Sequence, residues 1–310
     1  MLESLQFIYA PQIVNGLSIG VAVVLMALGL TIIFGLLDVI NMSHGEFYAA
    51  GAFISVSLMT MGISFWFCLL LVPLLLIPIG FAMERLLIQK VFHYKDRHIL
   101  TLLLTFGVAM VLEDAYKIIW GANPIKPSAP ISGASELLGV MFPNYRLFLM
   151  GFGALLIFSV WILIYKTQFG AIVRASAYDK DMSSSLGIPV MRVYALTFAF
   201  GVALAGLAGV LLAPIYSVFP TMGRDFILMA FSVVIVGGLG SIKGALIAGI
   251  LLTQLQSISS LYISPVWSDP LVFTVMVLVL MLALAGRLHP ISEDLYQQYF
   301  SLLSKLQEKC

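Results

Sequence analysis

The sequence predicts an all-α polytopic membrane protein, a bundle of about eight or nine transmembrane helices with one or more short or broken helices. Hydrophobic residues make up 61% of the 310 residues and charged residues only 10%, against about 25% charged residues in soluble domains. The mean hydropathy is +1.06. So few charged side chains cannot cover a globular surface, which excludes soluble enzymes. The net charge of +1 gives no field that would attract nucleic acid.

Apolar segments of the right length occur along the whole chain. A bilayer core about 30 Å thick takes about 20 residues of helix, and shorter helices are tolerated where protein buries them. The candidate spans are Gln12–Leu37, Gly45–Thr60, Ser64–Glu84, Ile99–Trp120, Arg146–Tyr165, Val193–Pro214, Asp225–Leu239, Gly244–Tyr262 and Leu271–Gly286. Two of them, 45–60 and 225–239, are shorter than a full crossing. We therefore expect one transmembrane domain over residues 1–310.

The basic residues predict how this domain is oriented. Most of the 16 Lys and Arg residues fall on one side of the layout, in the loops after spans three, five and seven and in the tail 287–310. Positive loops mark the cytoplasmic side. We therefore expect the N-terminus outside and the C-terminus inside. The loop 166–192 is then cytoplasmic, the proline-rich loop 121–145 is an extracytoplasmic cap, and Ile291–Cys310 has the spacing of an amphipathic surface helix.

Motifs for chemistry are missing from the sequence. The glycines of 237–244 lack the Gly-Lys-Ser/Thr ending of a phosphate-binding loop and are better explained as a tight corner between helices. His44-Gly45-Glu46 lacks the second histidine of a zinc-protease helix. Cys68 and Cys310 form neither a disulfide framework nor a metal motif. We expect no catalytic residue, no metal and no cofactor in this chain.

The segment from Asp38 to Tyr48 predicts irregular backbone that dips into the membrane. It has no basic residue, unlike an ordinary cytoplasmic hairpin, and a short span follows it. Broken helices of this kind present backbone groups to transported solutes. Asn41, His44 and Glu46 are the candidates for a translocation path, with Asn41 favoured because a neutral amide is less costly to bury than a charge. Ser43 and Glu46 also have the spacing of a helix capping box.

Small residues recur at helical spacing in the second half of the chain. Such rows allow helices to approach closely in lipid, so we expect spans six to eight to form a tight bundle. The helix-packing candidates are Gly201, Ala205, Gly209, Gly237, Gly238, Gly240 and Gly244. Charged residues close to predicted span ends are assigned to interfacial pairing, with Lys117 facing Glu113 and Asp114 on one helix. The others are Glu84, Arg224 and Asp225.

The loop 170–192 carries the most specific pattern. It predicts a short helix over 172–185, a stop at Gly187 and re-entry into the membrane. Apolar residues such as Met182 and Leu186 argue against a fully solvated loop. The run Arg174-Ala-Ser-Ala-Tyr-Asp179 with its continuation through Leu186-Gly187-Ile188 resembles the cytoplasmic coupling loop of permease subunits of ABC importers, in the branched-chain amino-acid family and its urea and amide relatives.

Two further segments are similar to that family. Asn41–Tyr48 resembles its early Asn/His-Gly element, and 237–245 resembles its Gly-Gly-x-Gly-Ser-x-x-Gly-Ala corner, although Lys243 stands where other members often have proline. The resemblance covers nearly the whole chain, in order. It implies that the loop contacts an ATPase subunit through Arg174, Ala175, Ala177, Asp179, Met182, Leu186, Gly187 and Ile188.

The resemblance also implies an assembly in a bacterial cytoplasmic membrane. Its members are a second homologous permease subunit, two ATPase subunits that hold ATP-Mg, and an extracytoplasmic solute-binding protein. The solute would be a branched-chain or other amino acid, or urea or a short amide. An alternative class is a stand-alone channel or secondary transporter, for which Asp38 and Glu46 are the carboxylates at depth. No set of residues supports a membrane enzyme.

Overall fold

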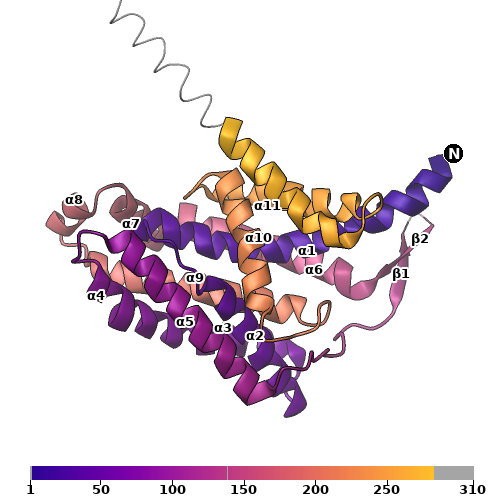
Figure 1. The fold of residues 1–310 in the computed structure, drawn as a ribbon, viewed down its shortest axis with the longest axis horizontal. Coiled ribbons are helices and arrows are strands. Elements are labelled where there is room, and N and C mark those ends of the chain that lie inside the picture. The colour runs from indigo at the N-terminus through magenta and orange to yellow at the C-terminus, as the bar shows by residue number, and fades with distance from the viewer. Residues whose placement is uncertain (1, 138, 283–310) are drawn as a thin grey trace, which may run out of the picture.

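The computed structural model describes residues 2–137 and 139–282 and is almost entirely helical (Figure 1). The helices are α1 (Leu2–Leu37), α2 (His44–Thr60), α3 (Phe65–Met83), a π-helical turn (Glu84–Ile88), α4 (Gln89–Val91), α5 (Arg97–Trp120), α6 (Asn144–Lys166), α7 (Gln168–Tyr178), α8 (Lys180–Ser185), α9 (Val190–Leu212), α10 (Met222–Gly237), α11 (Ile242–Ser259) and a last apolar helix, Ser268–Leu282. Two short strands, β1 (Ala134–Leu137) and β2 (Val140–Pro143), complete the fold.

The helices confirm the predicted membrane class. Six helices of the described residues are long and apolar enough to cross a membrane. The two segments predicted to be short are short helices, α2 with 17 residues and α10 with 16. The first helix is longer than predicted, because α1 begins at Leu2 and continues through Pro11. Residues 283–286 of the ninth predicted span and the predicted tail 287–310 lie outside the described residues.

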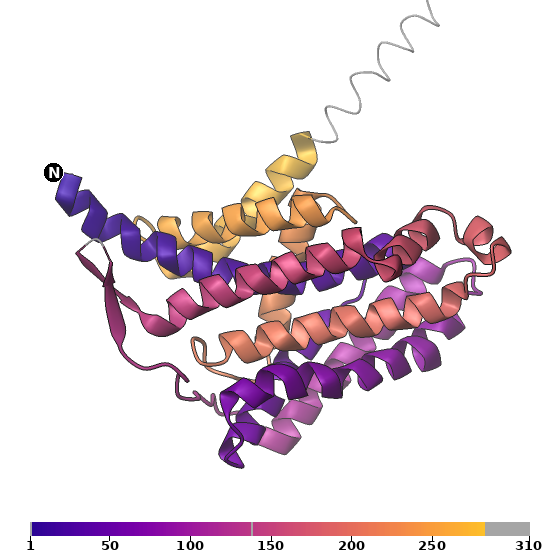
Figure 2. The ribbon, with the colours of Figure 1, turned by 180° about the vertical axis from the view of Figure 1, so that it is seen from behind.

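The centre of the bundle is formed by α1 and α9. Residues 20–33 of α1 and nearly all of α9 are buried, and α9 packs on α1, α2 and α3 (Figure 2). The small residues predicted on α9 permit this contact: an added Cβ at Gly201 would lie 2.6 Å from Cδ1 of Ile33, and one at Gly209 would overlap the carbonyl oxygen of Tyr48. The prediction that spans six to eight form one tight bundle is therefore wrong. Span six packs on the first three spans, whereas α10 and α11 pack on each other and on α1.

The two short helices begin against one another inside the bundle. Each follows a non-helical segment, residues 38–43 before α2 and 213–221 before α10. An added Cβ at Gly45 would overlap the carbonyl oxygen of Gly223, so only glycine permits this approach. Figure 1 shows α10 crossing the long axis of the bundle steeply, unlike its neighbours. The start of α2 lies at the level of Met26, about 16 Å along α1 from Leu37, because His44 Nε2 is 3.1 Å from the Met26 carbonyl oxygen.

The loop 121–145 contains a small β-hairpin, which the all-α prediction did not include. Strands β1 and β2 are antiparallel, with Ala134 opposite Pro143. The same loop is tied to the segment before α10 by two backbone hydrogen bonds between Ile125 and Val218, of 2.8 and 2.7 Å. The loop therefore covers one end of the bundle, and α7 and α8 lie at the other end (Figure 1).

Candidate functional site

The segment between α1 and α2 is irregular and buried, as the sequence predicted. Asp38 has a φ of 53°, and Asn41 is buried with its side-chain oxygen accepting bonds from Ser43 N (3.1 Å) and Ser43 Oγ (2.7 Å). The predicted capping box is wrong. In the described structure the Ser43 side chain makes no capping bond to α2, because its hydroxyl donates back to Asn41 instead. Asn41 therefore organises the turn that starts α2.

Helix α5 holds this segment in place. The Thr105 hydroxyl oxygen accepts a bond from Met42 N at 3.1 Å, and Tyr116 Oη donates to the Glu46 carbonyl oxygen at 2.8 Å. His44 is fully buried against α1, with its ring within 3.1 Å of a Cβ added at Gly29. The described residues contain no group of three or more metal-ligating side chains. His44 thus packs two helices together, whereas Glu46 lines a cavity.

That cavity lies between the starts of α2 and α10 and the middle of α5. It has a volume of about 220 Å³ and its polar lining consists of a group of charged side chains that we call the charged cluster: Glu46, Glu113, Asp114, Lys117 and Arg224. Lys117 Nζ lies 2.8 Å from Glu113 Oε1 and 3.0 Å from Asp114 Oδ1, which confirms the pairing predicted on one helix.

The sequence missed the pair between α5 and α10 in this cluster. Arg224 Nη2 lies 3.2 Å from Glu113 Oε1, across 111 residues of chain. The sequence places the two residues at separate span ends, because spacing along the chain carries no information on which helices meet. The opposite charges of Glu113 and Arg224 were the available signal, but the other unlike charges of the chain give the same signal.

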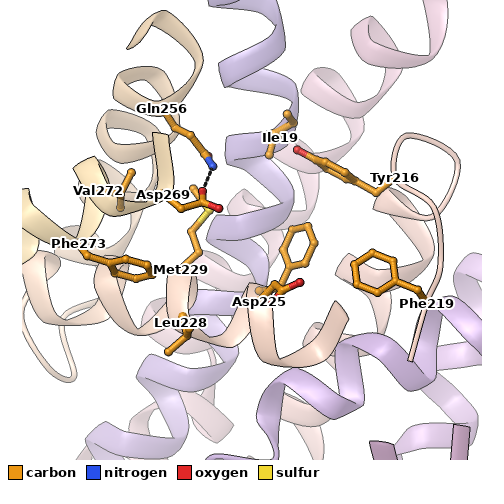
Figure 3. Close-up of a pocket in the computed structure, with 11 residues that line it drawn as sticks. Ile19, Tyr216, Phe219, Asp225, Leu228, Met229, Gln256, Asp269, Val272 and Phe273 are labelled. Atoms are coloured by element: carbon orange, nitrogen blue, oxygen red, sulfur yellow. Dashed lines mark hydrogen bonds between the residues drawn. The ribbon is translucent and has the colours of Figure 1, made fainter. Parts of the chain in front are cut away.

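A second cavity, of about 290 Å³, lies on the other side of α10 (Figure 3). Its walls are mostly apolar and come from α10, α11, the last helix and the segment before α10. Asp225 and Asp269 are its charged residues, and Gln256 donates to Asp269 at 2.6 Å. The Tyr216 hydroxyl also points toward this space. Asp225 therefore lines a pocket rather than only marking a span end, which its position in the sequence did not predict.

Glu84 also departs from its prediction as an interfacial charge. Its side chain is fully buried in the π-helical turn that follows α3. Gln89 Nε2 donates to Glu84 Oε2 at 2.8 Å and to the Met191 carbonyl oxygen at 3.1 Å. The wider turn of a π-helix brings residues five apart into register, so these hydrogen bonds of Gln89 join the end of α3 to the start of α9.

The glycines of 237–244 form the predicted corner. Gly238 and Gly240 have φ values of 90° and 79°, which glycine adopts without strain. A Cβ at Gly244 would overlap the Gly237 carbonyl oxygen, and one at Gly240 would lie 3.3 Å from Gly35 Cα. Ser241 caps α11 by accepting from Gly244 N at 3.1 Å. The corner therefore packs α10, α11 and the end of α1 closely, as expected of a structural element.

The predicted single helix over 172–185 is two helices. Asp179 leaves the helical conformation, with φ −150° and ψ 106°, and its side chain caps α8 by accepting from Asp181 N (3.0 Å) and Met182 N (2.9 Å). The predicted stop is confirmed: Gly187 has a φ of 86° and Ile188 N donates to the Ser183 carbonyl oxygen at 3.1 Å. Short polar side chains that cap helices break them as well.

The inner face of α7 packs against the bundle. Val173 and Ser176 are buried, and the Arg174 guanidinium donates to the Ile164 carbonyl oxygen and lies over the ring of Tyr165. Arg174, predicted to contact a partner, therefore anchors α7 to the end of α6. Thr167 caps α7 by accepting from Gly170 N at 3.2 Å.

The outer side of α7 and α8 carries exposed apolar side chains. Tyr178 is 95% exposed, Leu186 76% and Met182 62%, and Ile172 is also exposed. We call these four residues the α7–α8 apolar surface. Ala175, Ala177 and Asp179 are exposed beside it, and Ile188 is half-buried. Next to it, an open cleft of about 600 Å³ lies between the end of α7, the end of α1 and the corner 238–241.

Comparison with known proteins identifies a matching family and several similar proteins. The family described as "Branched-chain amino acid transport system / permease component" matches residues 12–280. The high-affinity branched-chain amino acid transport system permease protein LivH of Salmonella typhimurium is 32% identical over 91% of this chain and 96% of its own length. The permease protein BraD of Pseudomonas aeruginosa is 29% identical, over 90% and 95%.

A second type of permease is also similar. The permease protein LivM of the high-affinity branched-chain amino acid transport system of Escherichia coli is 27% identical over 74% of this chain and 59% of its own length. No solved structure matches the chain.

Proposed function

The chain belongs to the branched-chain amino acid permease family, a membrane-spanning component of ATP-driven import systems rather than an enzyme, and we propose that it moves a branched-chain amino acid across the membrane. The observation that supports this proposal most strongly is the similarity to LivH and BraD over nine-tenths of the chain. LivH and BraD are branched-chain amino acid permeases, which favours this substrate class over the urea and amide alternative. Family membership also argues against the alternative class, a stand-alone channel or secondary transporter, because members of this family are components of a larger transport system.

We further propose the assembly in which the chain works. Its similarity to both LivH and LivM supports pairing with a second, homologous permease subunit. Two ATPase subunits that bind ATP-Mg and an extracytoplasmic solute-binding protein would complete the importer. The basic loops support a cytoplasmic membrane location with the N-terminus outside and the C-terminus inside.

The α7–α8 apolar surface is our candidate for the contact with an ATPase subunit. Apolar side chains exposed to water mark surfaces that another protein covers. Arg174 and Val173 anchor α7 to the bundle, and the cap at Asp179 fixes the start of α8. A surface held this firmly can transmit a displacement to α1, α6 and α9, which α7 contacts or follows.

The experiment is ATP-dependent uptake of L-leucine by the reconstituted importer, with both permeases, the ATPases and the binding protein. Ala177→Glu adds a charge beside the α7–α8 apolar surface without affecting the chain's own core. We expect uptake to fall about tenfold or more, with stimulation of ATP hydrolysis by the loaded binding protein lost in parallel. Gly187→Glu should have the same effect, because it also strains the end of α8.

The matched control is Ser128→Glu, which adds the same charge to an exposed position in the loop 121–145. Its uptake should equal that of the unaltered importer. Normal uptake by Ala177→Glu would contradict the assigned surface, whereas the absence of L-leucine uptake in the unaltered importer would contradict the proposed function itself.

A further inference from the structure

We propose that the charged cavity between α2, α5 and α10 binds the zwitterionic part of the transported amino acid, with Arg224 taking the carboxylate and Glu46 the ammonium group. The inference rests on the proposed function and names the site on this chain through which the solute passes. It draws on four features: charge exposed at membrane depth, a buried carboxylate with a vacant oxygen, a guanidinium in the first turn of α10, and a cavity of matching size and polarity.

The first feature is the exposure of charged side chains within membrane-spanning helices. The Arg224 side chain is 61% exposed and that of Asp114 69%. Both belong to helices of the membrane bundle, and charged groups in such segments face protein or a water-filled cavity rather than lipid. The face formed by α5 and α10 (Figure 1) therefore meets water, solute or the second permease subunit.

The second feature is the Glu46 carboxylate. The residue is only 3% exposed, it lines the cavity, and its Oε2 has no hydrogen-bond partner among the described residues. Leaving a buried polar group unpaired is costly. An ammonium group of the solute supplies the missing donor when it enters the cavity. The opposite oxygen, Oε1, lies 2.6 Å from a Cβ added at Gly223, which fixes the carboxylate against the first turn of α10.

The third feature is the arrangement around Arg224, the residue proposed to bind the carboxylate of the solute. Arg224 uses Nη2 for Glu113, and a guanidinium has five donors in a fork that suits a carboxylate. It stands in the first turn of α10, and the starts of α2 and α10 meet beside it. Helix N-termini favour negative charge. Glu113 and Lys117 neutralise each other at 2.8 Å, so they hold Arg224 in place without competing for the solute.

Size and lining suit an amino acid with an aliphatic side chain. The cavity of about 220 Å³ is smaller than the roughly 300–1,000 Å³ of sites for drug-sized ligands. Phe106, Met110 and Ile227 give it an apolar wall. The larger cavity of Figure 3 is less suitable, because its charged residues are Asp225 and Asp269, with no cation to receive a carboxylate.

The test compares two variants in the reconstituted importer at saturating loaded binding protein. Arg224→Gln and Glu46→Gln should each lower L-leucine uptake about tenfold or more, as expected for a lost charge-assisted contact. The stimulation of ATP hydrolysis by the loaded binding protein should stay within about twofold, because the α7–α8 apolar surface is unaltered. Arg146→Gln, at the start of α6 and outside the cavity, is the control and should keep normal uptake.

A charge exchange separates binding from a merely structural ion pair. Glu113→Arg with Arg224→Glu restores attraction between α5 and α10 but places the wrong charge in the cavity. We expect the double variant to assemble and to remain inactive in uptake. Recovery of uptake in the double variant, or normal uptake in Arg224→Gln, would overturn the proposed site. Either result would leave the proposed function intact, since the unaltered importer still transports L-leucine.

Discussion

The charged cluster and the α7–α8 apolar surface both differ in polarity from their surroundings, but in opposite directions. The first exposes Arg224 and Asp114 on helices of the membrane bundle, and the second exposes Tyr178 and Leu186 at the end of the bundle. Neither arrangement stabilises the chain by itself, since each leaves side chains in an unfavourable medium. The comparison indicates that both surfaces are completed by something outside this chain, a solute in one case and a protein in the other.

The two regions also differ in how they are supported. The charged cluster depends on close backbone contact between α2 and α10, for which only glycine has room at position 45. The α7–α8 apolar surface depends on the cap at Asp179 and the stop at Gly187, and its own side chains are exposed. Substitutions should therefore destabilise the chain strongly at the contact beneath the charged cluster and only mildly at the α7–α8 apolar surface.

The largest expected effect on stability comes from adding a methyl group where α2 and α10 touch, beneath the charged cluster. In Gly45→Ala, the new methyl group overlaps the Gly223 carbonyl oxygen and lies 2.7 Å from Ile227 Cβ. We expect a loss of about 1–3 kcal/mol in the free energy of unfolding, measured as a lower melting temperature of the purified chain. Gly107→Ala, with nothing within 4 Å of the added Cβ among the described residues, should not destabilise the chain. Equal melting temperatures for the two variants would contradict this account.

An intermediate effect is expected at the cap of α8. Asp179→Ala removes the acceptor for Asp181 N and Met182 N, which should destabilise α8 locally by about 1 kcal/mol. Hydrogen exchange of the α8 amides should become faster, while exchange in α9 stays the same. Asp179→Asn should preserve protection because its side-chain oxygen also caps. Unchanged exchange in Asp179→Ala would show that α8 does not depend on this cap.

The smallest effect on the isolated chain is expected at the α7–α8 apolar surface. Leu186→Ser should change the free energy of unfolding by no more than about 0.5 kcal/mol, because the side chain is already exposed. Val173→Ser, on the buried face of α7, should cost about 1.5 kcal/mol or more. A large loss of stability in Leu186→Ser would mean that this surface serves the chain's own packing and not a partner.

The sequence by itself determined the features that depend on neighbouring residues along the chain. Hydropathy identified the helical membrane class and the two short helices, and the glycine spacing identified the corner at 237–244. Charge and polarity around 38–48 identified the irregular segment before α2. These properties are local: the length of an apolar run and the need of backbone groups for partners decide them before any helix meets another.

Only the tertiary structure decided which helices are neighbours and what their polar residues do. The sequence could not place α9 against α1, α2 and α3, join Glu113 to Arg224, or turn the Ser43 hydroxyl toward Asn41 instead of α2. The physical reason is that helices in lipid associate through close packing and a few polar contacts. Many pairings satisfy the same pattern of small residues, and the choice among them depends on the shape of the whole bundle.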